Sequence, residues 1–128
     1  MSREDTALVV FAHGSSIESA NDAVRDVGRA LADAGGYRVE AAFLGGGVPD
    51  LAGAVRKLVD GGVRQVVVAP YFLTLGLHLQ RDLPQLVDEV GAQFPEIRLA
   101  VTLPLDGHPL LVQILLDRAA SAMDGDGT

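Results

Sequence analysis

The 128-residue chain contains no cysteine and no tryptophan, and it has only three histidines. Without cysteine there can be no disulfide framework, zinc ribbon, iron–sulfur cluster or thiolate nucleophile. Basic residues are also scarce, because 10 Lys and Arg stand against 17 Asp and Glu and give a formal net charge of −7. A general nucleic-acid binder needs a basic face, so we expect no nucleic-acid partner. Any transition metal must be bound through imidazole or oxygen.

Long apolar runs are absent as well. The first apolar stretch, residues 7–12, is too short for the apolar part of a signal sequence and far too short to span a bilayer. We therefore expect a cytoplasmic protein with no membrane partner. The length is that of about one domain. We expect this domain to occupy residues 1–128, with frayed tails at residues 1–5 and 124–128.

What the chain does contain is a regular alternation of apolar runs and amphipathic stretches. The apolar runs predict strands at residues 7–12, 37–44, 65–71 and 97–103. The amphipathic stretches predict helices at 19–34, at 51–60, from the region 78–82 to about residue 94, and from residue 109 onward. Four strand–helix units predict an α/β fold, a three-layer sandwich with a four-stranded parallel sheet.

Several residues predict how the helices begin and which faces they bury. Ser19 with Asp22 reads as a capping-box variant at the start of the first helix, and Asp50 is a plausible N-cap for the second. The last helix has Pro109 in its first turn. Its residues expected to face inward are Leu111, Ile114, Leu115 and Ala119.

All three histidines follow strands of the predicted sheet. His13 comes one residue after the first strand, His78 follows the third and His108 follows the fourth. The carboxyl ends of parallel strands meet at one edge, and open α/β sheets bind their ligands there. We interpret His13 as an imidazole held rigidly at a strand end, and His78 as a second functional imidazole. His108 precedes Pro109 at a helix start, and its role stays open.

Two polar residues near these histidines have both a functional and a structural interpretation. If His78 opens a helical turn, Asp82 lies four residues on and on the same face. Its carboxylate could then orient the ring and raise its basicity, or form an ordinary ion pair at a helix start. Asn21 could contact a ligand or serve only the structure.

Several familiar active sites are excluded. There is no G-x-S-x-G elbow around Ser15 and Ser16 and no G-x-x-x-x-G-K-[ST] loop. Ala12 stands where phosphohistidine phosphatases carry an arginine. Gly45-Gly46-Gly47 only weakly supports a phosphate- or nucleotide-binding domain, because no Lys or Arg follows these glycines.

Three further motifs carry a resemblance to a known family. They are Ala12-His13-Gly14-Ser15 with Ala20-Asn21, then Val68-Ala69-Pro70-Tyr71-Phe72-Leu73 with Gly76-x-His78 and Asp82-x-Pro84, and finally Pro104-Leu105-x-Gly107-His108-Pro109. Over almost the whole chain they resemble the short CbiX/SirB-type sirohydrochlorin chelatases. The resemblance implies one half of the two-domain chelatase fold and a homodimer with its site in the cleft between the halves.

The resemblance also implies an activity. It is the insertion of Co²⁺ or Fe²⁺, sometimes Ni²⁺, into a tetrapyrrole in cobalamin or siroheme biosynthesis. The divalent metal is then a substrate, and no organic cofactor is expected. His13 and His78 match the two active-site histidines of the family by position. Either could hold the ion or accept a proton, since imidazole binds borderline metals and has an unperturbed pKa of about 6.5.

An anionic tetrapyrrole needs local donors on a protein of net negative charge. Backbone N–H groups in the glycine-containing loops could supply them. Arg81 could do so too, or could be a solvated helix charge. The substrate-binding residues that we expect are Gly14, Ser15, Gly45, Gly46, Gly47, Phe72 and Arg81.

The chain departs from the family pattern at two positions. Gly45 follows Phe43-Leu44 where the family usually has glutamate, and Ser16 stands where arginine is frequent. The missing carboxylate removes a metal ligand or a base, and Asp50 is a nearby candidate to replace it. A second function therefore stays open, that of a non-catalytic tetrapyrrole or metal binder on the same fold.

Overall fold

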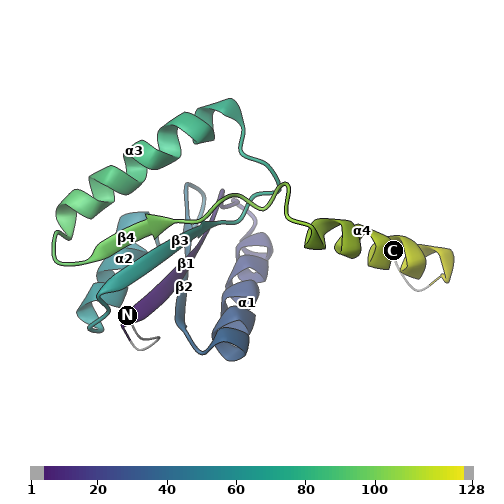
Figure 1. Cartoon of the computed structure of the whole chain (residues 1–128), viewed down its shortest axis with the longest axis horizontal. Helices are drawn as coiled ribbons and strands as arrows, with labels where there is room; N and C mark the ends of the chain where they lie inside the picture. Colours follow the sequence, from purple (N-terminus) through teal and green to yellow (C-terminus); the bar gives the residue numbers. More distant parts are fainter. Residues whose placement is uncertain (1–4, 126–128) are drawn as a thin grey trace.

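The computed structural model describes residues 5–125, which form four successive strand–helix units (Figure 1). The strands are β1 (Thr6–Ala12), β2 (Arg38–Phe43), β3 (Gln65–Pro70) and β4 (Arg98–Val101). The helices are α1 (Glu18–Gly35), α2 (Leu51–Asp60), α3 (Leu77–Gln93) and α4 (Leu110–Met123). Each predicted strand and helix is present. Of the tails expected to fray, residues 1–4 and 126–128 lie outside the described residues.

The four strands form one parallel sheet in the order β2-β1-β3-β4. The predicted α/β class and four-stranded parallel sheet are therefore confirmed. The chain leaves β1 toward β2 and then returns to β3 on the other side of β1, so the direction of the connections reverses between β1 and β3. Ligands of open α/β sheets bind at this switch point. Within residues 5–125, no helix is long and apolar enough to cross a membrane.

Helices cover both faces of the sheet and make three layers. On one face, α2 and α3 bury apolar side chains against all four strands. On the other face, α1 packs on β1 and β2, where Val24 contacts a small cluster of Ala12, Ala41 and Phe43. Burial of these two apolar clusters is the main source of stability for such a fold.

The last helix does not join these layers. From the carboxyl end of β4, α4 extends away from the sheet (Figure 1). None of its residues is buried. The prediction that Leu111, Ile114, Leu115 and Ala119 face inward is therefore wrong for the single chain. A helix buries an apolar face only where a sheet or another helix lies against it, and nothing within the described chain covers α4.

The helix starts agree with the sequence for α2 and α3 but not for α1 and α4, since Pro109 occupies the N-cap position before Leu110 and not a place in the first turn of α4. Asp50 caps α2, since its Oδ1 accepts a hydrogen bond of 2.8 Å from the Gly53 N–H. The α3 helix begins at Leu77, so the region 78–82 is its first turn. The capping box predicted from Ser19 is wrong, because α1 already begins at Glu18 and Ile17 occupies the N-cap position without a side-chain cap.

Candidate functional site

The loops after β1, β2 and β3 are joined at the carboxyl edge of the sheet by backbone hydrogen bonds. The Leu44 N–H donates to the Ala12 carbonyl and the Gly45 N–H to the His13 carbonyl, both at 2.9 Å. The Tyr71 N–H donates to the Phe11 carbonyl at 2.7 Å. These bonds continue the strand pairing beyond the strand ends. As predicted, His13 lies at this edge, and it stands at the switch point between β1 and β3.

The His13 imidazole is exposed, and its ring is held by an aromatic contact. It meets the Phe72 ring edge to face, with centroids 4.6 Å apart and an interplanar angle of 84°. Phe72 is buried and in turn lies edge-on to Phe11 of the core, at 6.4 Å between centroids. Edge-to-face packing is the preferred geometry of such pairs and restricts ring rotation. The core therefore orients an imidazole that stays open to ligands.

A buried amide joins the loop after β1 to the loop after β2. Asn21 is only 1% exposed, and its Oδ1 accepts from the Ser15 N–H at 2.9 Å. Its Nδ2 donates to the Ser15 carbonyl at 2.9 Å and to the Gly46 carbonyl at 3.1 Å. The structure therefore gives Asn21 a structural contact at the site. The sequence signal for this role was a polar residue in the first turn of a helix that packs on a sheet.

The glycines of this region allow the two loops to approach each other. Gly14 has φ of +84°, and a Cβ at this position would lie 1.7 Å from the Gly45 carbonyl oxygen. Gly46 has φ of +71°, and a Cβ there would lie 3.0 Å from the backbone of Ser15. At Gly45, in contrast, a Cβ would meet nothing within 4 Å.

Two of the backbone donors expected for the substrate are already used within the protein. Asn21 accepts the hydrogen bond of the Ser15 N–H, and the His13 carbonyl accepts that of the Gly45 N–H. Asp50, the candidate replacement for the missing carboxylate, accepts a hydrogen bond as the cap of α2. The glycine-containing loops therefore use these groups for their own geometry.

An ion-pair network, which the sequence interpretation missed, holds the outer side of these loops. Arg25 Nη1 lies 2.5 Å from Glu18 and 2.8 Å from Asp22, and its Nη2 donates to the Val48 carbonyl at 3.1 Å. The hydrogen bond from Arg25, followed by one from Asn21, lowers the pKa of the Glu18 carboxyl. The two carboxylates raise the pKa of Arg25. The spacing of residues 18, 22 and 25 on one helix face was the available signal.

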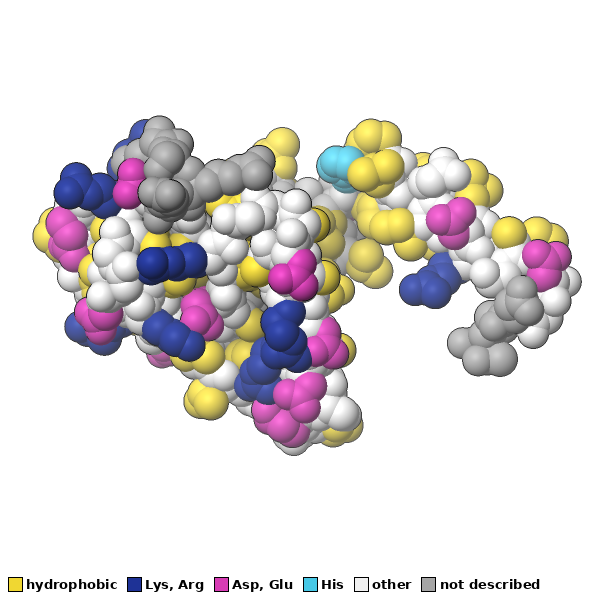
Figure 2. Space-filling view, turned by 90° about the horizontal axis from the view of Figure 1, so that it is seen from below, with side chains coloured by type: hydrophobic (Ala, Val, Ile, Leu, Met, Phe, Trp, Pro, Cys, Tyr) yellow, Lys and Arg dark blue, Asp and Glu magenta, His cyan; other side chains and the backbone are white. Residues whose placement is uncertain are grey.

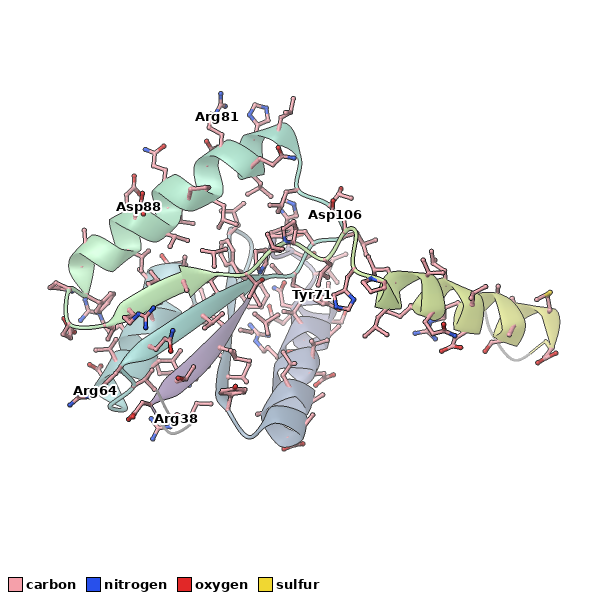
Figure 3. The ribbon with its side chains drawn as sticks, in the orientation of Figure 1. Arg38, Arg64, Tyr71, Arg81, Asp88 and Asp106 are labelled. Carbon is pink, nitrogen blue, oxygen red and sulfur yellow. The ribbon has the colours of Figure 1, made fainter. Side chains whose placement is uncertain are left out.

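His78 lies in the first turn of α3 and is exposed. Its Nδ1 is 3.3 Å from Arg81 Nη2, and Arg81 Nε is 3.5 Å from the Asp82 carboxylate. Figure 3 shows Arg81 at the start of α3, pointing away from the sheet. Arg81 thus contacts both the imidazole and the carboxylate. The orienting effect of Asp82 on His78 stays a prediction.

His108 has a local contact at the start of α4. Its Nδ1 accepts a hydrogen bond of 3.1 Å from the Leu110 N–H. Among residues 5–125, no three His, Asp or Glu side chains gather in a way that could hold a metal ion. The structure therefore places the predicted histidines on loops or helix starts that follow strands, without a closed set of ligands around them.

The carboxyl edge also carries exposed apolar side chains from all four loops. Large exposed apolar patches on soluble proteins mark binding sites. The residues are Ile17 after β1, Leu44 and Val48 after β2, Tyr71, Leu73 and Leu77 after β3, and Leu103 after β4. The edge therefore combines an oriented imidazole with apolar surface.

Comparisons with known proteins point to one family. The model of the CbiX family matches residues 7–122. A sirohydrochlorin cobaltochelatase of Priestia megaterium is 32% identical over 124 residues, which cover 96% of this chain and 40% of that protein. The chloroplastic sirohydrochlorin ferrochelatase of Arabidopsis thaliana is 30% identical over 123 residues, covering 93% and 55%. The chain thus spans about half the length of these relatives.

The fold has a close counterpart among solved structures. A putative cobalamin biosynthesis CbiX protein from Marinobacter aquaeolei superposes with a TM-score of 0.84 at 22% identity, covering 93% of this chain and 98% of that one. The predicted chelatase-like fold is thereby confirmed. Since the family match extends over nearly the whole chain and agrees with the motifs and the fold, the protein belongs to the CbiX family.

Proposed function

We propose that the chain inserts Co²⁺ or Fe²⁺ into sirohydrochlorin or a closely related tetrapyrrole. The observation that carries this proposal is the oriented, exposed His13 imidazole at an edge that displays apolar side chains from four loops. The face of a tetrapyrrole ring is broad and apolar, so such an edge suits it. The two relatives named above are a cobaltochelatase and a ferrochelatase of sirohydrochlorin, which supports the same reaction.

The residues of the edge match the needs of metal insertion. The reaction brings a divalent ion to the ring face, forms the metal–nitrogen bonds and releases two pyrrole N–H protons. A neutral imidazole can hold the ion or accept a proton, so His13 and His78 are the two groups to which we assign these tasks. Arg81, exposed beside His78, offers a cation to a substrate carboxylate. The metal is a substrate, and no organic cofactor enters the proposal.

One observation favours a second candidate, a non-catalytic binder of tetrapyrrole or metal. Gly45 provides no carboxylate at the position where the family resemblance leads us to expect one, and the described residues form no three-ligand metal group. A non-catalytic binder would keep the apolar edge that holds its ligand but would not insert a metal into the tetrapyrrole. With the leading function we also propose the homodimer that the family resemblance implies and the cytoplasmic location expected from the sequence.

The test is anaerobic mixing of the full chain with sirohydrochlorin and Co²⁺ or Fe²⁺, followed by absorption. We expect a metallation rate above the spontaneous one, and a fall of at least about tenfold in each of His13→Ala and His78→Ala. His108→Asn is the matched control, since asparagine can still accept the hydrogen bond of the Leu110 N–H. Full activity of the double alanine variant would refute the catalytic proposal. Tight tetrapyrrole binding without metallation would support the second candidate.

A further inference from the structure

The two histidines assigned to the reaction differ in what their ring nitrogens contact. The His78 Nδ1 lies 3.3 Å from Arg81 Nη2. The two residues are three apart on α3, so their side chains share one face of the helix. The His13 ring is held by the Phe72 ring instead, and no hydrogen bond joins its ring nitrogens to another of residues 5–125. The two imidazoles are therefore not equally open to a ligand.

The chemistry of arginine decides the direction of the hydrogen bond at His78. A guanidinium has five N–H donors and no acceptor, so Arg81 donates and the His78 Nδ1 accepts. A neutral imidazole carries one N–H, which must then be on Nε2. The lone pair of Nδ1 is thus used by Arg81, and Nε2 holds the proton. In this state His78 has no free lone pair with which to hold a metal ion or accept a proton.

The positive charge of Arg81 acts in the same direction. A divalent ion bound to a ring nitrogen lies about 2.1 Å from it, so it would come close to a guanidinium that is itself in contact with the ring. Like charges at such a distance repel each other, because the separation is shorter than the screening length of about 8 Å in physiological salt. The contact therefore opposes metal binding at either nitrogen of His78.

A carboxylate is the group best suited to remove Arg81 from His78. Guanidinium–carboxylate pairs are charge-assisted and often bidentate, and they are stronger than a hydrogen bond to a neutral ring. The carboxylate already nearby does not form such a pair, since Arg81 Nε is 3.5 Å from the Asp82 Oδ1. The Arg81 side chain is also 73% exposed. Its guanidinium is therefore held weakly and is open to an incoming anion.

Other basic side chains are less available to an anion at the carboxyl edge. Arg25 is bound by two carboxylates, and its side chain is only 27% exposed. Arg38 and Arg64 lie at the amino ends of their strands, at the opposite edge of the sheet (Figure 3). On the face shown in Figure 2, Lys and Arg lie interspersed with Asp and Glu, so their charges largely cancel for an approaching anion. Arg81 is thus well placed to meet a substrate carboxylate.

We propose that Arg81 is a positioning residue that withholds His78 from the reaction until a carboxylate of the tetrapyrrole draws the guanidinium away. The exchange frees the Nδ1 lone pair, and His78 can then hold the ion or accept a pyrrole proton. His13 meets the ion without this step. The tetrapyrrole therefore binds before His78 takes part. The exchange with a substrate carboxylate rests on the proposed function, whereas the block of His78 by Arg81 does not.

The first test is anaerobic titration of the full chain with Co²⁺ in the absence of tetrapyrrole. We expect Arg81→Met to bind Co²⁺ at least about threefold more tightly than the wild type, which is the size of effect that one such hydrogen bond carries. Arg81→Lys keeps a donor and a cation and should resemble the wild type. Arg29→Met removes an equal charge from the exposed surface of α1 and is the matched control, with unchanged affinity.

A second background shows whether the gain acts through the imidazole. When Arg81→Met is combined with His78→Ala, the gain in Co²⁺ affinity should disappear. Thermal unfolding of each variant checks that the chain is folded. Unchanged or weaker Co²⁺ binding by Arg81→Met would overturn the proposal. A gain that persists without the His78 ring would also overturn it, because Arg81 would then act on another ligand.

The second test is steady-state metallation of sirohydrochlorin. We expect Arg81→Met to raise KM for the tetrapyrrole at least about tenfold, because a charge-assisted contact is lost, and to change kcat by less than about threefold, because His78 is already free. Arg81→Lys should recover most of the KM. An unchanged KM would refute the exchange with a substrate carboxylate. A chain that shows the gain in Co²⁺ affinity but does not metallate would refute the proposed reaction alone, and a chain that metallates without that gain would refute the block of His78 alone.

Discussion

Replacement of Asn21 tests whether one buried amide holds the two loops at the site. In Asn21→Ala, the Ser15 N–H, the Ser15 carbonyl and the Gly46 carbonyl all lose their side-chain partner. A buried polar group left unsatisfied costs about 1–3 kcal/mol, and water can reach part of this region because Gly46 is exposed. We therefore expect a loss of about 3 kcal/mol in the free energy of unfolding, or roughly 10 °C in Tm.

The aspartate variant sharpens this test, because it changes hydrogen-bonding chemistry at nearly constant shape. In Asn21→Asp, the carboxylate can still accept from the Ser15 N–H, but its other oxygen faces two carbonyls and lies near Glu18. Burial and this neighbour raise the pKa of the new carboxyl in the folded state. We expect the Asn21→Asp variant to be less stable than the Asn21→Ala variant at pH 7. The destabilisation should shrink as the pH falls toward about 4, where the protonated group can donate again.

Urea unfolding at pH 7 and pH 4 measures both effects. Ser19→Ala is the control, since Ser19 is an exposed residue in the same helical turn and should change stability by less than about 0.5 kcal/mol. A stability loss in Asn21→Ala as small as that in Ser19→Ala would refute the structural role of the Asn21 amide. So would an Asp variant as stable as the wild type at pH 7.

Three further predictions test other contacts of the site and the fold. Gly14→Ala should lose more than about 3 kcal/mol of stability, because its Cβ would overlap the Gly45 carbonyl, whereas Gly45→Ala should cost less than about 1 kcal/mol; a similar loss for both would contradict the close approach of the loops. Glu18→Gln should lower stability at neutral pH but not in acid. Folding lowers the pKa of Glu18, so the stability that its carboxylate contributes is present above pH 4.5, its ordinary pKa, and is lost as the pH falls through the lower pKa of the folded state. The same dependence of stability on pH in the wild type and in Glu18→Gln would refute this. Asp50→Ala should cost about 1 kcal/mol through loss of the α2 cap, measured by thermal unfolding, and Asp50→Asn should recover most of it.

The sheet and the helix order could be predicted because they follow from patterns within single segments. The apolar run of residues 7–12 is buried on both faces, and Asp50 caps a helix regardless of the rest of the fold. The inward face of α4 could not be predicted in the same way. The apolar positions show that Leu111 and Ile114 need a partner, but which body supplies it depends on the direction of the chain after β4.

The candidate site shows the same division. The rule for parallel sheets places His13 and Phe72 at one edge, and the structure brings their rings into contact. The partner of His78 depends on the rotamers of a helical turn, and the structure gives it Arg81 where the sequence suggested Asp82. The role of Asn21 as a link between two loops depends on a contact with Gly46, 25 residues away in sequence. A polar residue in the first turn of the helix signals a contact, but no local pattern identifies Gly46 as the partner.

The open surroundings of Gly45 have a consequence for how this protein can diverge. A Cβ at this position would meet nothing within 4 Å, and the backbone lies outside the left-handed region, so the position accepts a residue other than glycine without backbone strain. The Gly45 N–H donates a hydrogen bond to the His13 carbonyl, so a side chain at residue 45 would begin beside the backbone of the residue that carries the imidazole. In evolutionary terms, a residue with a Cβ can therefore replace Gly45 without displacing a core side chain. A series with Gly, Ala, Gln and Glu at residue 45 therefore isolates the effect of one carboxylate on a constant scaffold.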